Sequence, residues 1–168
     1  LRQFIQDVLW GKLDYLIIDL PPGTGDVQLS LLQHTKINGV VVVTTPQRVA
    51  LADARKAIGM FQMEKINVPI LGVVENMAWF SPPEAPEQRY FLFGEQGGLH
   101  LAKEYDLPFL GHLPFAVPMR ERGDGLKSTL DEEQMTYIDQ IAGACAQTLA
   151  LQNAKVTSQK SSNLPPIR

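Results

Sequence analysis

Three short runs of apolar, mostly β-branched residues dominate the chain, and stretches with helical periodicity separate the second run from the third and follow the third. The runs occupy residues 15–19, 40–44 and 70–74. Each is apolar on both faces instead of alternating with polar residues, which is typical of central strands in a sheet that is covered on both sides. The pattern predicts an α/β fold with a mainly parallel sheet flanked by helices.

Further elements follow from the same kind of pattern. A helix is predicted between the second and third runs, where apolar residues recur at helical spacing: Leu51, Ala54, Ile58 and Phe61. A helix over about 98–105 and a fourth strand over 109–113 come next. Thr129 and Glu132 fit a capping box that opens a last helix. Its expected buried stripe consists of Met135, Ile138, Ile141, Ala142, Cys145 and Leu149.

Two segments depart from this rhythm. Residues 81–88 contain three prolines and are therefore predicted to form an exposed loop. Residues 152–168 are too polar to bury themselves and are predicted to form a flexible tail. The sequence thus predicts one domain over residues 1–151, followed by this tail.

Composition excludes several classes of protein. The 168 residues include 15 Lys and Arg against 18 Asp and Glu, a balance that argues against nucleic-acid binding. One cysteine, Cys145, allows no internal disulfide and favours a reducing compartment. It is expected to be a buried, unreactive thiol. No apolar window is long enough to span a membrane and the first residues do not resemble a signal peptide, so a cytoplasmic protein without membrane contact is expected.

The loop after the first run carries residue types suited to phosphate and metal binding. Asp19 ends the predicted strand, where a carboxylate can face Mg²⁺, and Gly23 and Gly25 let backbone N–H groups approach an anion. A lysine-bearing phosphate loop is excluded because Asp26 and Val27 stand where Lys and Ser or Thr are needed. The order suits a Walker B aspartate followed by a switch loop. From spacing alone, a plain strand end followed by a turn is an equal alternative.

Five blocks of the sequence, in order, resemble the Mrp (ApbC-like) family of deviant P-loop ATPases, which is related to MinD and ParA. They are DYLIIDLPPGTGD, GVVVVTTPQRVALADARKAIGMF, VPILGVVENMAWF, FGEQGG and PFLGHLPF. The resemblance covers roughly residues 14–149 and implies a partial P-loop NTPase domain. In the family, the lysine-bearing glycine motif lies upstream of the first block. Residues 1–151 are therefore expected to be the carboxyl-terminal part of the ATPase domain, inactive when alone.

The resemblance also implies roles for particular residues. The residue matching Asp19 arranges the Mg²⁺ shell through water, and the one matching Gly23 senses the terminal phosphate; these two are the expected catalytic residues. Asn76 is expected to help hold the adenine. The remaining nucleotide-binding residues implied by the family pattern are Pro22 and Thr24 in the first loop and Pro114 and Phe115 in the loop after the fourth strand. A simply packed Phe115 is the alternative.

The implied function is that of a homodimeric Mg-ATPase that carries or assembles iron-sulfur clusters, with ATP and scaffold or recipient proteins as partners. Many relatives hold a bridging [4Fe-4S] cluster through a CPxC motif, but Pro82 and Ala85 replace its cysteines. The alternative is a nucleotide-switched, MinD- or ParA-like binding or scaffold protein without a cluster. The aromatic residues around the proline-rich loop are expected either to anchor that loop or to form a partner contact: Trp79, Phe80, Tyr90, Phe91 and Phe93.

Overall fold

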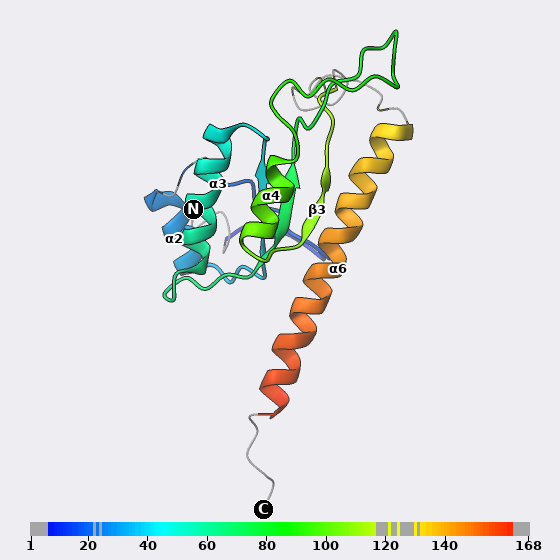
Figure 1. Cartoon of the computed structure of the whole chain (residues 1–168). Helices are drawn as coiled ribbons and strands as arrows, with labels where there is room; N and C mark the ends of the chain where they lie inside the picture. The colour runs from blue at the N-terminus through cyan, green and yellow to red at the C-terminus, as the bar shows by residue number, and fades with distance from the viewer. Residues whose placement is uncertain are drawn as a thin grey trace, which may run out of the picture.

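A computed structural model describes residues 7–21, 23, 25–116, 121, 124, 130 and 132–162. Helices and parallel strands alternate through most of this part (Figure 1). The helices are α2 (Asp26–His34), α3 (Arg48–Gln62), α4 (Gly97–Glu104) and α6 (Glu132–Ser162); the strands are β1 (Val40–Thr44), β2 (Ile70–Glu75) and β3 (Phe109–His112). The α/β class expected from the sequence is confirmed.

The strands form one parallel sheet in the order β1-β2-β3. Because β2 lies in the middle, it is the most deeply buried strand, and Val73 in it is fully buried. Strands β1, β2 and β3 lie where the sequence predicts them, as do α3 and α4. Parallel strands need crossover connections, and α3 and α4 supply them.

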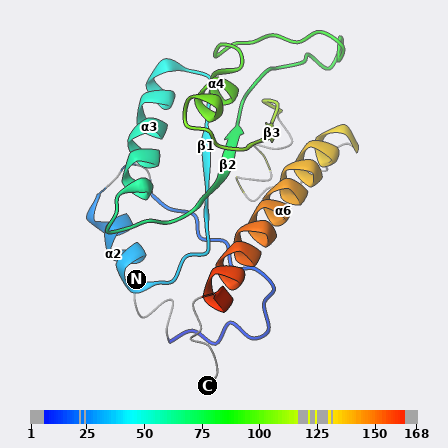
Figure 2. The same ribbon diagram turned by 60° about the horizontal axis from the view of Figure 1, so that its bottom comes forward.

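The main core lies between the sheet and the two crossover helices. Helix α3 packs on β1 and α4 packs on β2, while α6 packs against β3 and β2 (Figure 2). The buried cluster consists of Val42, Ala54, Ile58, Val73, Leu101 and Ala102. On β1, Val41 and Val43 point away from this core and are 37% and 59% exposed. The helices therefore cover β2 more completely than β1.

The first predicted strand is wrong. Residues 15–19 are irregular and pair with no strand of the described chain; Ile17 is 90% exposed and Tyr15 is 60% exposed. An apolar run indicates that a segment can be buried in a sheet, but a strand also needs a hydrogen-bonding neighbour. Within the described part, the sheet ends at β1, and residues 15–19 do not extend it.

Helix α6 is longer and less buried than the sequence predicts. It continues through Ser162 and so crosses the expected boundary between residues 151 and 152. In the predicted stripe, Met135 and Ala142 are exposed, and the other members are only half-buried. The reason is that α6 packs against part of one sheet face and has no layer outside it. Thr129 lies outside the described residues. Among the described helices, none combines the length and apolarity needed to cross a membrane.

Candidate functional site

The loops that follow the three strands are joined by backbone hydrogen bonds at the carboxyl end of the sheet. The amide of Asn76 donates to the carbonyl of Thr44 (2.7 Å), and that of Leu113 donates to the carbonyl of Glu75 (2.8 Å). Ala78 and Phe115 then donate to Leu113 and Trp79, at 2.9 Å and 2.7 Å. The loop that carries Asn76 therefore runs beside the loop that carries Pro114 and Phe115. Ligands bind at this edge in open α/β sheets.

The side chain of Asn76 is oriented by its own loop. Its Oδ1 accepts a hydrogen bond from the amide of Met77 (2.9 Å), whose backbone is left-handed with φ of 54°. This contact uses the carbonyl end of the amide, and its NH₂ end makes no hydrogen bond with a described residue. The ring of Phe115 lies 6.3 Å from that of Phe80, so it packs within the protein as the alternative expected.

The loop after residue 20 is held by a buried glutamine. Gln28 in α2 is 3% exposed, and its Nε2 donates to the carbonyls of Pro21 (2.6 Å) and Gly23 (3.0 Å). Gly23 has φ of +97°, a conformation that favours glycine. Gly25 is the N-cap of α2. Of the predicted residues here, Pro22 and Thr24 lie outside the described part of the chain.

Asp19 precedes the loop that Gln28 holds to α2. Its side chain is exposed and makes no hydrogen bond or ion pair with any described residue. The structure brings the loops of Asn76, Pro114 and Phe115 together and ties Gly23 to α2. Within the described residues, Asp19 forms no hydrogen bond to either group. Sequence reasoning missed Gln28; its place one turn into the helix after a glycine loop was the available signal.

Sequence reasoning also missed Glu75, the last residue of β2. Its side chain is 1% exposed, and one carboxylate oxygen accepts a hydrogen bond from the amide of Gly98 in the first turn of α4. The positive end of a helix dipole favours a carboxylate at this position. The other oxygen lies 3.6 Å from Nε2 of His112. The available signal was an acid that closes an otherwise apolar run.

The approach of α4 to β2 depends on glycine. A Cβ on Gly98 would lie 2.9 Å from Cβ of Glu75, and one on Gly97 would lie 2.7 Å from the carbonyl oxygen of Pro46. The FGEQGG block therefore lets the start of α4 rest directly on the ends of β1 and β2. This packing fixes the base of both loops at the carboxyl edge.

The proline-rich segment is a loop, as predicted. Phe80 and Tyr90 exchange backbone hydrogen bonds at its base, and turns close at Ala85 and Gln88. Trp79 is buried and anchors the loop, whereas Tyr90 and Phe91 are 48% and 43% exposed. The expectation of an anchor is met by Trp79, and a partner contact through Tyr90 and Phe91 stays a prediction.

The donor chemistry of this loop does not suit an iron-sulfur cluster. Pro82 and Ala85 carry no thiol, and the single cysteine of the chain lies on α6. Burial raises the pKa of the Cys145 thiol, which disfavours the thiolate that iron requires. Among the described residues, no group of three or more His, Cys, Asp or Glu side chains could hold a metal ion.

Comparison with known proteins shows which family the chain resembles. Residues 1–150 match the model of the ParA family described as NUBPL iron-transfer P-loop NTPase. The chain is 52% identical over 124 residues to an iron-sulfur cluster carrier protein of Synechocystis, covering 74% of this chain and 35% of that protein. It is 45% identical over 166 residues to one of Deinococcus radiodurans, covering 98% of this chain and 46% of that protein.

A solved structure agrees. The nucleotide-binding protein of Archaeoglobus fulgidus in complex with ADP matches with a TM-score of 0.64 and 43% identity, over 73% of this chain and 49% of that one. The chain thus spans half or less of the length of these proteins. The family model covers most of the chain, and the resemblance to Mrp proteins seen in the sequence is confirmed. The chain belongs to the ParA family of NUBPL-type iron-transfer P-loop NTPases.

Proposed function

We propose that an intact protein containing this chain is a cytoplasmic, homodimeric Mg-ATPase of the Mrp type that works in iron-sulfur cluster assembly. The family match supports the nucleotide chemistry, and the Synechocystis and Deinococcus relatives are both named iron-sulfur cluster carrier proteins. Its partners would be ATP and the scaffold or recipient proteins that exchange clusters with it. The observation that carries the proposal is the pairing of the Asn76 and Phe115 loops at the carboxyl edge of the sheet.

This edge would hold the base of the nucleotide. The NH₂ group of Asn76 would donate to an adenine ring nitrogen, while Pro114 and the edge of Phe115 would form the opposite wall. Hydrogen bonds between the loops fix the distance between these walls before a ligand arrives, which lowers the entropy lost on binding. The relative from Archaeoglobus fulgidus that shares this fold is itself bound to ADP.

Asp19 fits the magnesium role. Mg²⁺ usually keeps several waters and is held by one or two carboxylates together with substrate phosphates. An exposed carboxylate that makes no hydrogen bond or ion pair with the described residues can accept bonds from such waters. When bound, the ion would neutralise charge on the phosphates. Gly23, with Pro22 and Thr24 beside it in the loop, would respond to the terminal phosphate, and Gln28 would hold that loop to α2.

We expect the 168-residue chain to show no measurable ATP turnover on its own. Its sequence contains no glycine loop followed by Lys and Ser or Thr, so nothing in it replaces the lysine that neutralises the phosphates. Phosphate release with Mg-ATP would be compared between the chain and a longer protein that carries the lysine motif. Turnover by the chain at the rate of the longer protein would contradict this assignment.

A second candidate is a nucleotide-switched binding or scaffold protein that carries no cluster. The replacement of both motif cysteines by Pro82 and Ala85 favours it, as does the position of Cys145 on a distant helix. Cys145 is the one cysteine among these 168 residues, so a pair of such chains brings two thiolates from this part of the protein, and a [4Fe-4S] cluster takes four. The nucleotide chemistry is common to both candidates, so cluster binding separates them.

Restoring the motif is expected to create cluster binding. After anaerobic reconstitution with iron and sulfide, the P82C/A85C variant should hold roughly four irons per two chains, whereas the parent chain should hold almost none. The reason is that one turn of the loop brings residues 82 and 85 together, because the amide of Ala85 donates to the carbonyl of Pro82 at 3.0 Å. Iron and sulfide analysis with visible absorption provides the measurement.

The E84C/E87C variant is the matched control, because it adds the same number of thiols at the same spacing in the same loop. It should bind much less iron than P82C/A85C. A stoichiometric cluster in the parent chain would contradict the scaffold reading and support the carrier. Equal iron in both double variants would show that the position of the thiols is unimportant and would remove the argument from the motif.

A further inference from the structure

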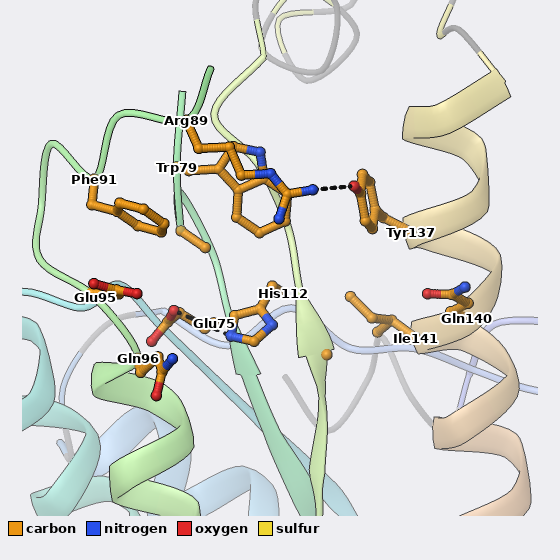
Figure 3. Close-up of a pocket in the computed structure, with 12 residues that line it drawn as sticks. Glu75, Trp79, Arg89, Phe91, Glu95, Gln96, His112, Tyr137, Gln140 and Ile141 are labelled. Carbon is orange, nitrogen blue, oxygen red and sulfur yellow. Dashed lines mark hydrogen bonds and ion pairs between the residues drawn. The ribbon is translucent and has the colours of Figure 1, made fainter. Parts of the chain in front are cut away.

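A cavity of about 370 Å³ lies by the carboxyl ends of β2 and β3, between the segment after the proline-rich loop and α6. Figure 3 shows residues from the strand ends, this segment and α6 converging on it. Its polar lining includes Glu75, Arg89, Glu95, Gln96, His112 and Tyr137. Neither Asn76 nor Phe115 lines it, so the cavity is separate from the proposed nucleotide site.

One end of the cavity is acidic. Glu75 is almost completely buried, and its second carboxylate oxygen faces the imidazole of His112 at 3.6 Å, which is longer than a hydrogen bond. Glu95 lies beside Glu75 at this end, as Figure 3 shows. Two carboxylates in a partly enclosed space attract a positively charged group more strongly than they would in open water.

The lining also holds a cation, Arg89. The guanidinium of Arg89 lies 4.2 Å over the ring of Trp79, and its Nη2 donates to the hydroxyl of Tyr137 at 3.3 Å. The Tyr137 hydroxyl in turn donates to Glu133 at 2.7 Å, which orients the tyrosine from α6. A guanidinium carries five N–H donors, so Arg89 keeps donors for a carboxylate after making these contacts.

We propose that this cavity binds a small zwitterion of the α-amino-acid class. The ammonium group would lie toward Glu75 and Glu95, and the carboxylate would lie toward Arg89. The apolar part of the lining, which includes Phe91 and Ile141, would contact an aliphatic side chain. A lining that holds both signs of charge selects a dipolar ligand over a simple amine or a simple acid. The cavity volume lies within the range of small-molecule sites, which is about 300–1,000 Å³.

The test uses Trp79 as a reporter. The chain has two tryptophans, so the W10F variant leaves only the ring that lies under Arg89. L-leucine, 3-methylbutylamine and 4-methylpentanoate share a side chain and differ only in their charged groups. Titration up to about 20 mM, followed by fluorescence and by calorimetry, should show that leucine binds at least about tenfold more tightly than either analogue.

Variants test which charged residue of the cavity binds which group of the ligand. R89Q should bring the affinity for leucine down to that for the amine, and E95Q should bring it toward that for the acid. E87Q, an exposed acid in the neighbouring loop, should change nothing. Circular dichroism would confirm that each variant folds; Glu95 is exposed, so its substitution does not disturb the core. No binding by either method, or an amine that binds as tightly as leucine, would overturn the proposal.

Discussion

Replacing Gly72 with alanine should lower the free energy of unfolding by about 3 kcal/mol. A Cβ at this position would lie 2.5 Å from the carbonyl oxygen of Pro108 and 2.6 Å from Cγ of Leu110. Gly72 also has φ of +155°, which L-residues rarely adopt. Because Pro108 accepts the backbone hydrogen bond of Val73 at 2.9 Å, relief of the collision would have to separate β2 from β3.

Gly59→Ala is the matched control. Gly59 lies in the interior of α3 on its exposed side, and a Cβ there would meet no atom within 4 Å. Alanine is the better helix former, so this change should raise stability by about 0.5–1 kcal/mol. Urea denaturation of both variants measures the two effects. A G72A variant within about 0.5 kcal/mol of the parent would show that the strands can part without loss.

Strand separation would also reach the proposed nucleotide edge. The loop bonds that pair Asn76 with Phe115 begin where β2 and β3 end, and Leu113 donates to the carbonyl of Glu75 at that point. The stability of the central strand pair and the spacing of the two loops therefore depend on the same contacts. Glycine stands at both close approaches. Gly72 lets β2 and β3 come together, and the glycines of the FGEQGG block let α4 rest on the ends of β1 and β2; a methyl group at either place would push these elements apart.

The sequence predicts most of the described sheet and both crossover helices, because continuous apolar runs and helical periodicity report burial directly. The same signal fails at residues 15–19. These residues are as apolar as β1, yet no strand of the described chain lies beside them. A strand is defined by its neighbour, and the identity of a neighbour is a property of topology that a local pattern does not contain.

The length of α6 was missed for a different reason. Residues 152–162 are mostly polar, and polar composition predicts a flexible tail. A helix that has already formed extends one residue at a time without a new nucleation step, so polar residues can continue it in solvent. The apolar pattern therefore predicts where a helix lies better than it predicts where the helix ends.

At the candidate site, the sequence predicts the residues that a family pattern marks, and the structure adds those that support them. Asn76 and Phe115 are 39 positions apart, and the prediction that they form two walls of one site is consistent with the paired loops. Gln28 holds the backbone of the loop just before its own helix, and Glu75 accepts a hydrogen bond from Gly98, which lies 23 positions away. The bond of Glu75 depends on tertiary arrangement, so its sequence signal is weak, whereas the bonds of Gln28 are local.

Asp19 carries the largest functional effect that we expect. Removing its charge by D19N should reduce the ATP turnover of the longer protein by about a hundredfold or more, because the waters around the metal would lose the carboxylate that orients them. Since Asp19 is exposed, the substitution should leave the unfolding free energy nearly unchanged. A loss of activity with unchanged stability separates a role in chemistry from a role in folding.

D14N is the control, because Asp14 is an exposed aspartate in the same segment. The decisive measurement is the Mg²⁺ dependence of phosphate release by the parent protein, D14N and D19N at saturating ATP. We expect the parent and D14N to respond alike, and D19N to stay about a hundredfold slower even at high Mg²⁺. Equal turnover by D19N and the parent at every magnesium concentration would contradict the assignment of Asp19 to the metal.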